Sequence, residues 1–450
     1  MKKWLEKRGY LEVINSLKKR KFIGYTGLAI KNSIYQFLTS LVGKVGGLIF
    51  TIILARILMP ELFGLYSLAL STIFIFISLT DLGISSAIVE FVSKYISQNK
   101  DQKAKAYLTY LFKLRILLLG ILIIFLALSS KFLAQNYYQK PIFLALLAGT
   151  LYLIFFSLIT FIQSILHSLN KFKEIFYKEI FSQIIRFVLA PLFILFILKK
   201  SLSQEINLFW IVAIIALTYF FALIFLWILT KNKIKFLKTK NQLISKKEKI
   251  KLILFILPLS ATIFTEAFFG NIDIIMLGRF ISAELIGYYK ASFILIFSIA
   301  PLLSFSTVLF PIFSRLKGKR LEKGFKKTIN IILPLSVMLS FLIFIFTPLI
   351  VKIIFGKEYL GMIPFLRLFS ILLFSLPLTQ VYISYLISLG KSKEIMRLLI
   401  CSTLMNILLN LGSISLLKIY GEIAITLGVA LSTILSRYFF LLGAIYYKRK

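Results

Sequence analysis

Seven positively charged side chains stand inside long apolar stretches of the sequence, where a charge is costly and therefore marks a functional candidate. Lys44 lies near the middle of its stretch, beside Gly43, Gly46 and Gly47, which permit close packing or bending. Arg437 lies midway along the last stretch. Arg and Lys pair well with phosphate, so such cations could bind an anionic headgroup. The candidates for this site are Lys44, Arg437, Arg186, Lys113, Arg115, Lys290 and Arg367.

Some of these cations have an alternative explanation, because a long side chain can reach the membrane interface from one or two helical turns inside. Lys113, Arg115 and Arg186 are predicted about two turns from one end of their helices, and Arg367 and Lys290 near the opposite end of theirs. For these five, snorkelling is the alternative to binding.

Carboxylates also lie within apolar stretches, and such groups can take up a proton or Na⁺ and couple transport to a gradient. Glu266 and Asp273 are seven residues apart, two helical turns, and so share one helix face. Asp81 is the third candidate for ion coupling. The alternative is a structural ion pair, such as Asp81 with Lys44. Glu90 lies nearer a helix end, where we expect it to be solvated or paired.

The sequence gives little support for a disulfide framework, a metal centre, an enzyme active site or nucleic-acid binding. One cysteine and one histidine in the whole chain argue against a disulfide framework and a His/Cys metal cluster. We therefore expect no catalytic centre, no metal and no cofactor apart from a coupling Na⁺ or H⁺. The net charge of +37 does not indicate nucleic-acid binding, because the basic residues form short runs between apolar blocks. That arrangement predicts contact with membrane lipids.

The elements that position these side chains are predicted to be membrane-spanning helices. The chain is 59% hydrophobic and only 16% charged, against about a quarter charged in soluble domains, and its mean hydropathy is +0.92. The apolar blocks are long enough to cross a bilayer, which takes ~20 residues. The predicted spans are 32–56, 65–92, 107–129, 141–166, 179–198, 208–229, 252–278, 288–313, 328–350, 362–389, 395–417 and 423–447.

The distribution of basic residues predicts the topology. Alternate connections hold 9, 4, 3, 9, 7, 3 and 3 Lys and Arg residues, while the connections between them hold one or two. Because cytoplasmic loops are enriched in Lys and Arg, we expect a multi-pass protein of the cell membrane with both termini cytoplasmic. Residues 1–30 lack the continuous apolar segment of a signal peptide and fit an amphipathic cytoplasmic helix or, as the alternative, a frayed basic tail.

An internal repeat relates the two halves. Residues 55–69 align without gaps onto 278–292, with identical pairs that include Gly64 and Gly287. A second match, 166–175 with 386–395, has nearly the same offset. Six helices separate equivalent points, so the halves have the same orientation, as in two-lobed transporters. The predicted organisation is an N-lobe (31–230), a basic cytoplasmic linker (231–251) and a C-lobe (252–450), two parallel six-helix lobes around a central cavity.

Several motifs resemble those of the polysaccharide-export branch of the multidrug/oligosaccharidyl-lipid/polysaccharide (MOP) flippase superfamily. They are LARILMPELFGLYSLALS at 54–71, DLGISSAIVEFVSKY at 81–95, FGNIDIIMLGRFISAELIGYYKAS at 269–292 and SLGKSKE at 388–394. The resemblance implies a flippase that moves a polyprenyl-(pyro)phosphate-linked oligosaccharide through a cavity between the lobes. It also implies a glycan polymerase or glycosyltransferases as functional partners.

Three alternatives stay open. A cation-coupled multidrug exporter of the same superfamily favours acidic cavities, whereas here the embedded bases outnumber the acids. A membrane glycosyltransferase or glycan polymerase needs carboxylates or histidine at a membrane face, and the outer connections predicted here are short. A non-transporting scaffold of glycan assembly would leave a labelled lipid-linked sugar untransported in vesicles.

Overall fold

The computed structural model describes residues 24–231, 233–239, 242–304, 309, 313 and 316–449. The amphipathic helix predicted within residues 1–30 falls almost wholly outside this range. In chain order the helices are α2 (Gly24–Asp81), α3 (Ile84–Ala87), η1 (Ile88–Val92), α4 (Ser93–Ser97), α5 (Asp101–Lys131), η2 (Phe132–Tyr138), α6 (Phe143–Ser168), α7 (Phe172–Leu198), α8 (Gln204–Thr230), η3 (Lys235–Lys238), α9 (Lys246–Leu277), α10 (Ala283–Ser304), α12 (Lys319–Ile354), η4 (Lys357–Met362), α13 (Ile363–Ser370), α14 (Leu372–Ser388), α15 (Ser392–Leu417), η5 (Lys418–Tyr420) and α16 (Glu422–Arg449).

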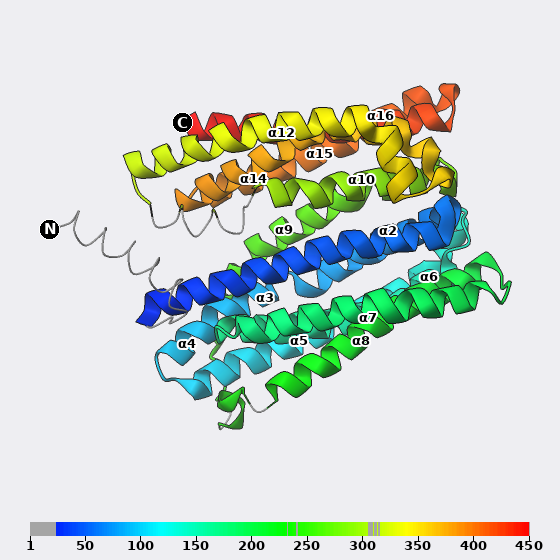
Figure 1. The fold of residues 1–450 in the computed structure, drawn as a ribbon. Coiled ribbons are helices and arrows are strands. Elements are labelled where there is room, and N and C mark those ends of the chain that lie inside the picture. The colour runs from blue at the N-terminus through cyan, green and yellow to red at the C-terminus, as the bar shows by residue number, and fades with distance from the viewer. Residues whose placement is uncertain are drawn as a thin grey trace.

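The described helices account for twelve membrane crossings. Ten helices are long and apolar enough to cross, and the bent pair Lys357–Ser370 and Leu372–Ser388 raises the number to eleven. One of the ten, Lys31–Ser97, has 67 residues, whereas ~20 span a bilayer. It turns back at Met59, whose φ of 58° is not helical, and so crosses twice (Figure 1). The predicted all-α membrane fold of about twelve helices is confirmed.

Two predicted spans are less regular than expected. The second span breaks after α2, where Leu82 and Gly83 have φ values of 40° and 86°, and it continues as α3, η1 and α4. The Asp81 carboxylate accepts a hydrogen bond from the Ser85 backbone N–H at 3.2 Å, which satisfies a donor at the new helix start. The tenth span is bent by 44° between α13 and α14.

The two halves of the chain pack along opposite sides of α2. In Figure 1, α5 to α8 of the N-terminal half lie below α2, and α12 to α16 of the C-terminal half lie above it. The helix α2 contacts α6 and α7 in its own half and α9 and α10 in the other. A single large hydrophobic core contains residues of both halves. The boundary along α2, α9 and α10 is therefore where a passage between the halves would lie.

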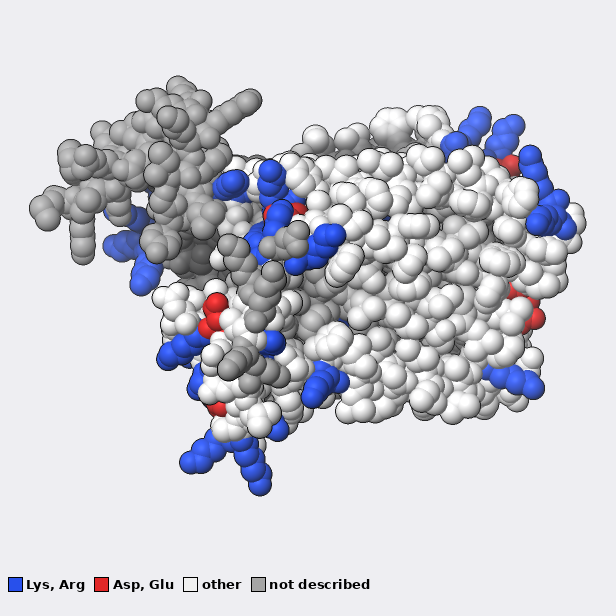
Figure 2. Space-filling model, turned by 90° about the horizontal axis from the view of Figure 1, so that it is seen from below, with Lys and Arg blue, Asp and Glu red and all other residues white. Residues whose placement is uncertain are grey.

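Charged and apolar side chains occupy different parts of the surface, as expected for a protein that spans a membrane. Lys and Arg gather at the two ends of the bundle in Figure 2, with a broad uncharged belt between them. Leu128 and Phe341 lie on the outside of helices α5 and α12 and are 77% and 64% exposed, which only a lipid environment favours. We use "basic end" for the end with the turns at 98–100, 169–171 and 389–391, and "far end" for the end with the turn at Met59.

Candidate functional site

A cavity of about 190 Å³ lies where α2 meets α7, α8 and α10. We term it the cationic cavity, because Arg186 of the N-terminal half and Lys290 of the C-terminal half both line it. No carboxylate is among its described lining residues. The lining side chains are Phe50, Thr51, Phe63, Tyr66, Ser67, Leu70, Ser71, Phe74, Tyr152, Arg186, Ile215, Tyr219, Lys290 and Ile294, with Gly47 beside them.

Arg186 forms no ion pair with any described residue and lies on the wall of this cavity. Its guanidinium stacks over the Tyr219 ring, 4.5 Å from the ring centre, and the Tyr219 hydroxyl is hydrogen-bonded to Tyr152 at 2.9 Å. Its buried Nε has no hydrogen-bond partner among the described residues. Gly46 lets α2 and α7 approach closely, since a Cβ there would lie 2.7 Å from the Gln183 side chain. This close approach holds Arg186, one turn further along α7, against the cavity.

Lys290 reaches the cavity from the other half of the molecule. It lies on α10, and its Nζ donates a hydrogen bond of 3.2 Å to the Ser71 hydroxyl on α2. Its ammonium also lies 5.6 Å from the ring centre of Phe293 on its own helix. Because the contact with Ser71 joins the two halves, movement of one half relative to the other would change the position of this charge.

Three other predicted headgroup residues lie elsewhere. Lys44 is half-buried on α2, one turn from Gly47 on the same helix face, so it lies toward the basic end of the cationic cavity. Lys113 is exposed on α5. Arg367 is exposed near the far end, with its guanidinium 5.7 Å from the Phe344 ring centre. Neither of the two exposed cations lines a described cavity.

Arg115 is fully buried and uses its donors within the protein. It forms an ion pair with Asp81, and it donates hydrogen bonds to the Ser157 hydroxyl at 2.8 Å and the Ser157 carbonyl oxygen at 3.0 Å. Lys44, the partner suggested for Asp81 by the sequence, does not bind it. The pair joins the break after α2 to α5 and α6.

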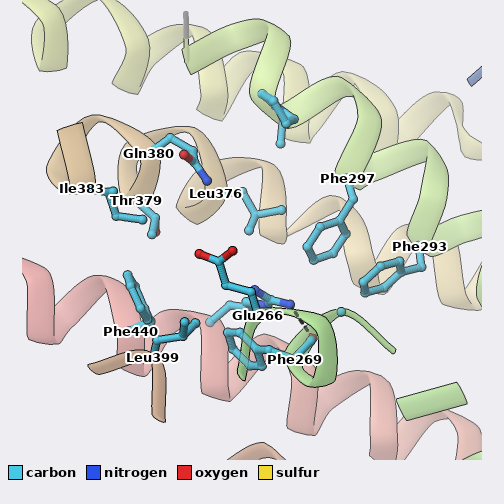
Figure 3. A pocket seen from close by; sticks show the side chains of 14 residues that line it. Glu266, Phe269, Phe293, Phe297, Leu376, Thr379, Gln380, Ile383, Leu399 and Phe440 are labelled. Atoms are coloured by element: carbon cyan, nitrogen blue, oxygen red, sulfur yellow. Dashed lines mark hydrogen bonds between the residues drawn. The ribbon is translucent and has the colours of Figure 1, made fainter. Parts of the chain in front are cut away.

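A second cavity, of about 380 Å³, lies within the C-terminal half. We term it the aromatic cavity, because Phe269, Phe293, Phe297 and Phe440 line it. Figure 3 shows the Glu266 carboxylate directed into this space. Arg437 lines the same cavity together with Thr379 and Gln380. The remaining lining residues are Gly270, Ala300, Pro301, Leu376, Ile383 and Leu399.

Arg437 lies flat on one wall of the aromatic cavity. Its guanidinium carbon is 3.4 Å from the ring centre of Phe269 and 5.0 Å from that of Phe297. Its Nη2 donates a hydrogen bond of 2.7 Å to the Phe269 carbonyl oxygen, the dashed line in Figure 3. The structure thus places Arg437 and Lys290 in different cavities, although the sequence grouped them in one site.

Asp273 lies in the core of the C-terminal half, apart from Glu266. Its carboxylate accepts hydrogen bonds from Asn410 at 2.7 Å, Thr433 at 2.7 Å and Tyr289 at 3.0 Å. Asn406, one turn from Asn410 on α15, is 1% exposed, and both its side-chain polar atoms lack a partner among the described residues. Sequence reasoning missed these neutral side chains, and the only available signal was their spacing of four residues in an apolar helix.

The far end of the bundle is closed by contacts that pair the two halves. The hydroxyl of Tyr359 donates to the Ala55 carbonyl oxygen at 2.8 Å. Arg56 donates hydrogen bonds to the carbonyl oxygens at the end of α12. The equivalent Arg279 stacks over Tyr137 of η2, 5.6 Å from the ring centre. Both arginines therefore bridge the two halves of the molecule.

Comparison with solved structures identifies the fold. An inward-facing multidrug resistance MATE family transporter of the MOP superfamily matches with a TM-score of 0.71 at 14% identity, covering 92% of this chain and 98% of that one. An outward-facing transporter of this kind matches with a TM-score of 0.62 at 18% identity, covering 94% and 96%. The lipid II flippase MurJ in an inward closed conformation gives 0.64 at 17% identity, covering 92% and 87%.

Comparison of the sequence with models of protein families shows the family to which the chain belongs. No curated protein matches the chain. The MatE family model matches residues 258–411. A second model, described as polysaccharide biosynthesis protein, matches residues 29–317, well over half of the chain. The chain therefore belongs to the polysaccharide biosynthesis protein family and has the fold of the MOP superfamily transporters.

Proposed function

We propose that this protein is a flippase that moves a polyprenyl-(pyro)phosphate-linked oligosaccharide from the cytoplasmic to the outer leaflet by alternating access. The observation that carries the proposal is the cationic cavity. Arg186 and Lys290 come from opposite halves, line one space and have no carboxylate beside them in that lining. Family membership and the likeness to flippase and drug-transporter structures support a transport role.

A phosphorylated headgroup suits this cavity better than a cationic drug does. Two positive charges in a space of low dielectric attract an anion strongly and repel a cation. The hydroxyls of Ser67 and Tyr66 can donate further hydrogen bonds to phosphate oxygens. The lipid chain would stay in the bilayer while the headgroup passes between the halves. This charge balance favours the flippase over the multidrug exporter.

The closed far end supports access of the cargo from the basic end. Contacts across α2, α10 and α12 seal that end. The positive-inside argument makes the basic end cytoplasmic. In this state cargo would enter from the cytoplasmic side, and the far end would open in a later state. Glycosyltransferases would supply the cargo and a glycan polymerase would receive it.

Asp273 is our proposed coupling group. It is a buried carboxylate that accepts hydrogen bonds from a threonine hydroxyl, a tyrosine hydroxyl and one asparagine side chain. Carboxylate, hydroxyl and amide oxygens are ligands for hard cations, and a buried carboxylate can instead bind a proton. Either Na⁺ or H⁺ would therefore fit here. Asp81, which is paired with Arg115, is less suited to the task.

Transport in vesicles tests the proposal. The protein would be reconstituted with lipid carrier extracted from the producing cells and radiolabelled in its oligosaccharide. Flipped cargo would become accessible to a membrane-impermeant oxidant. We expect Arg186→Gln and Lys290→Gln each to slow transport about tenfold or more, because a charge-assisted hydrogen bond contributes ~1.5–3 kcal/mol. The control is Lys113→Gln, which alters an exposed cation. Equal transport in protein-free vesicles would contradict the proposal.

A further inference from the structure

The aromatic cavity differs from the cationic cavity in its chemistry. One carboxylate, Glu266, and one guanidinium, Arg437, line it, so the formal charges of its lining side chains sum to zero. Four phenyl rings are part of its wall. We propose that this cavity binds an uncharged sugar ring of the cargo, next to the phosphate in the cationic cavity, an inference that rests on the proposed function.

The polar groups of the cavity are suited to hydroxyl groups. Glu266 has no hydrogen-bond or ion-pair partner among the described residues, and its carboxylate is directed to the middle of the cavity in Figure 3. Gln380, from α14 on the facing wall, offers an amide that can donate and accept. Thr379 lies beside it. A sugar ring carries many hydroxyls that donate to a carboxylate and accept from an amide or guanidinium.

The aromatic rings are suited to the other part of such a ligand. A sugar ring presents C–H groups on its faces, and these pack on the electron-rich faces of phenyl rings. Phe293 and Phe297 are stacked on each other, with ring centres 3.9 Å apart. Phe440 lines the opposite side of the cavity from these two rings in Figure 3. The cavity thus combines apolar faces with hydrogen-bonding groups, as binding sites for small polar ligands do.

Other ligands are less well matched. A phosphate would meet the Glu266 carboxylate, and a cation would meet Arg437. A hydrocarbon chain would leave the side chains of Glu266 and Gln380 without hydrogen bonds, which is costly for polar groups taken out of water. A neutral ligand rich in hydroxyls avoids all three penalties.

The two cavities are neighbours along α10. Lys290 and Ile294 line the cationic cavity, while Phe293 and Phe297 line the aromatic cavity. The rise between Lys290 and Phe297 is ~10 Å along the helix axis. One cargo molecule could therefore place its phosphate beside Lys290 and a sugar ring against Phe297 at the same time.

Photocrosslinking of the full chain in the producing cells tests this arrangement. Benzoylphenylalanine would replace Phe297 in the aromatic cavity, Phe50 in the cationic cavity or Phe341 on the lipid-facing surface. Adducts would be labelled through sugar diols by periodate oxidation and then treated with mild acid, which breaks the bond between sugar and diphosphate. At position 297 we expect the sugar label to survive and a polyprenyl diphosphate to be released. At position 50 the lipid should stay and the sugar should be lost.

Each other outcome has a definite meaning. An adduct at position 297 that keeps lipid and loses sugar would overturn the sugar site, as would an adduct at 50 with none at 297. A sugar adduct at 297 that releases no lipid would show a free saccharide and would also overturn it. Absence of any adduct at both positions would count against the flippase itself. Position 341 should capture bilayer lipid without a sugar label.

Binding to purified protein gives a second, independent test. Glu266→Gln should weaken binding of the sugar-bearing carrier about tenfold, as loss of a hydrogen bond to a charged group predicts. Binding of the polyprenyl diphosphate without sugar should change less than about twofold. Lys290→Gln should weaken both ligands. Equal losses for both ligands in Glu266→Gln would contradict a role in sugar binding.

Discussion

Gly64 and Gly287 occupy equivalent positions in the two halves, 223 residues apart in the sequence, and each lies against the backbone of the other half. A Cβ added at Gly64 would lie 1.8 Å from the Ala283 carbonyl oxygen, and one added at Gly287 would lie 2.1 Å from that of Pro60. Pro60 and Ala283 are themselves an equivalent pair at the same offset. The contact is therefore reciprocal, and it brings α2 and α10 together at the far end as closely as backbones permit.

Gly64→Ala should open the far end. The added methyl group cannot fit, because the facing atoms are backbone, so the two halves must separate there. In a Cys401→Ser background with Thr51→Cys in the cationic cavity, we expect membrane-impermeant maleimide from the far side to label Cys at least about fivefold faster. Flipping should fall in parallel, since a flippase must also close this end.

The control for this substitution is Gly120→Ala, because a Cβ at Gly120 would have nothing within 4 Å. Gly287→Ala should reproduce the effect of Gly64→Ala, as the reciprocal contact requires. Unchanged labelling in both glycine variants, with normal flipping, would show that this contact does not govern access.

We expect Arg115 to stabilise the folded protein. Replacing it by Gln leaves the Asp81 carboxylate without its cation, and removal of one member of a buried ion pair costs ~3–5 kcal/mol. The lower part of that range applies, because the Asp81 side chain is 23% exposed. The double variant Asp81→Asn/Arg115→Gln should recover part of the loss. The measurement is the unfolding midpoint in detergent or nanodiscs, followed through loss of native fluorescence or of monodispersity.

The matched control is Lys326→Gln, which removes the exposed ion pair with Glu322 on α12. Such pairs contribute ~0–1 kcal/mol, so this variant should unfold close to the wild-type midpoint. If Arg115→Gln were equally stable but failed to transport, its role would lie with the cargo.

The membrane-spanning helices could be predicted because hydropathy and loop charge are properties of single residues, and the repeat because equivalent residues are identical at nearly one offset. The sequence did not predict which cations share a cavity. Arg186 was placed about two turns inside its helix, but α7 begins at Phe172, fourteen residues before it, since the mixed segment at its start is helical too. A helix that is apolar on all sides gives no periodicity to show which face is inward, so Lys290 and Arg437 could not be assigned to different cavities. Asn406 and Asn410 are not among the predicted site residues, because only charged side chains within apolar stretches are candidates by that criterion.

Asp273→Asn should uncouple transport from its driving gradient. The amide has nearly the shape of the carboxylate and can still contact Thr433, Tyr289 and Asn410, so the helices should keep their packing. It carries no negative charge and so cannot bind a proton or hold Na⁺ as the carboxylate would. We therefore expect stimulation of flipping by an imposed Na⁺ or pH gradient to disappear, while slow downhill exchange continues.

The measurement compares initial rates of flipping in vesicles with and without each gradient, applied separately. Thr433→Val, which removes only a hydroxyl next to Asp273, should reduce the stimulation several-fold. Glu322→Gln, an exposed carboxylate near the basic end of α12, should leave it unchanged. Because Thr433 and Asp273 lie on different helices, α16 and α9, an ion held between them would fix how these helices pack. Full stimulation in Asp273→Asn would place the coupling ion elsewhere, and Glu266 would be the carboxylate to examine next.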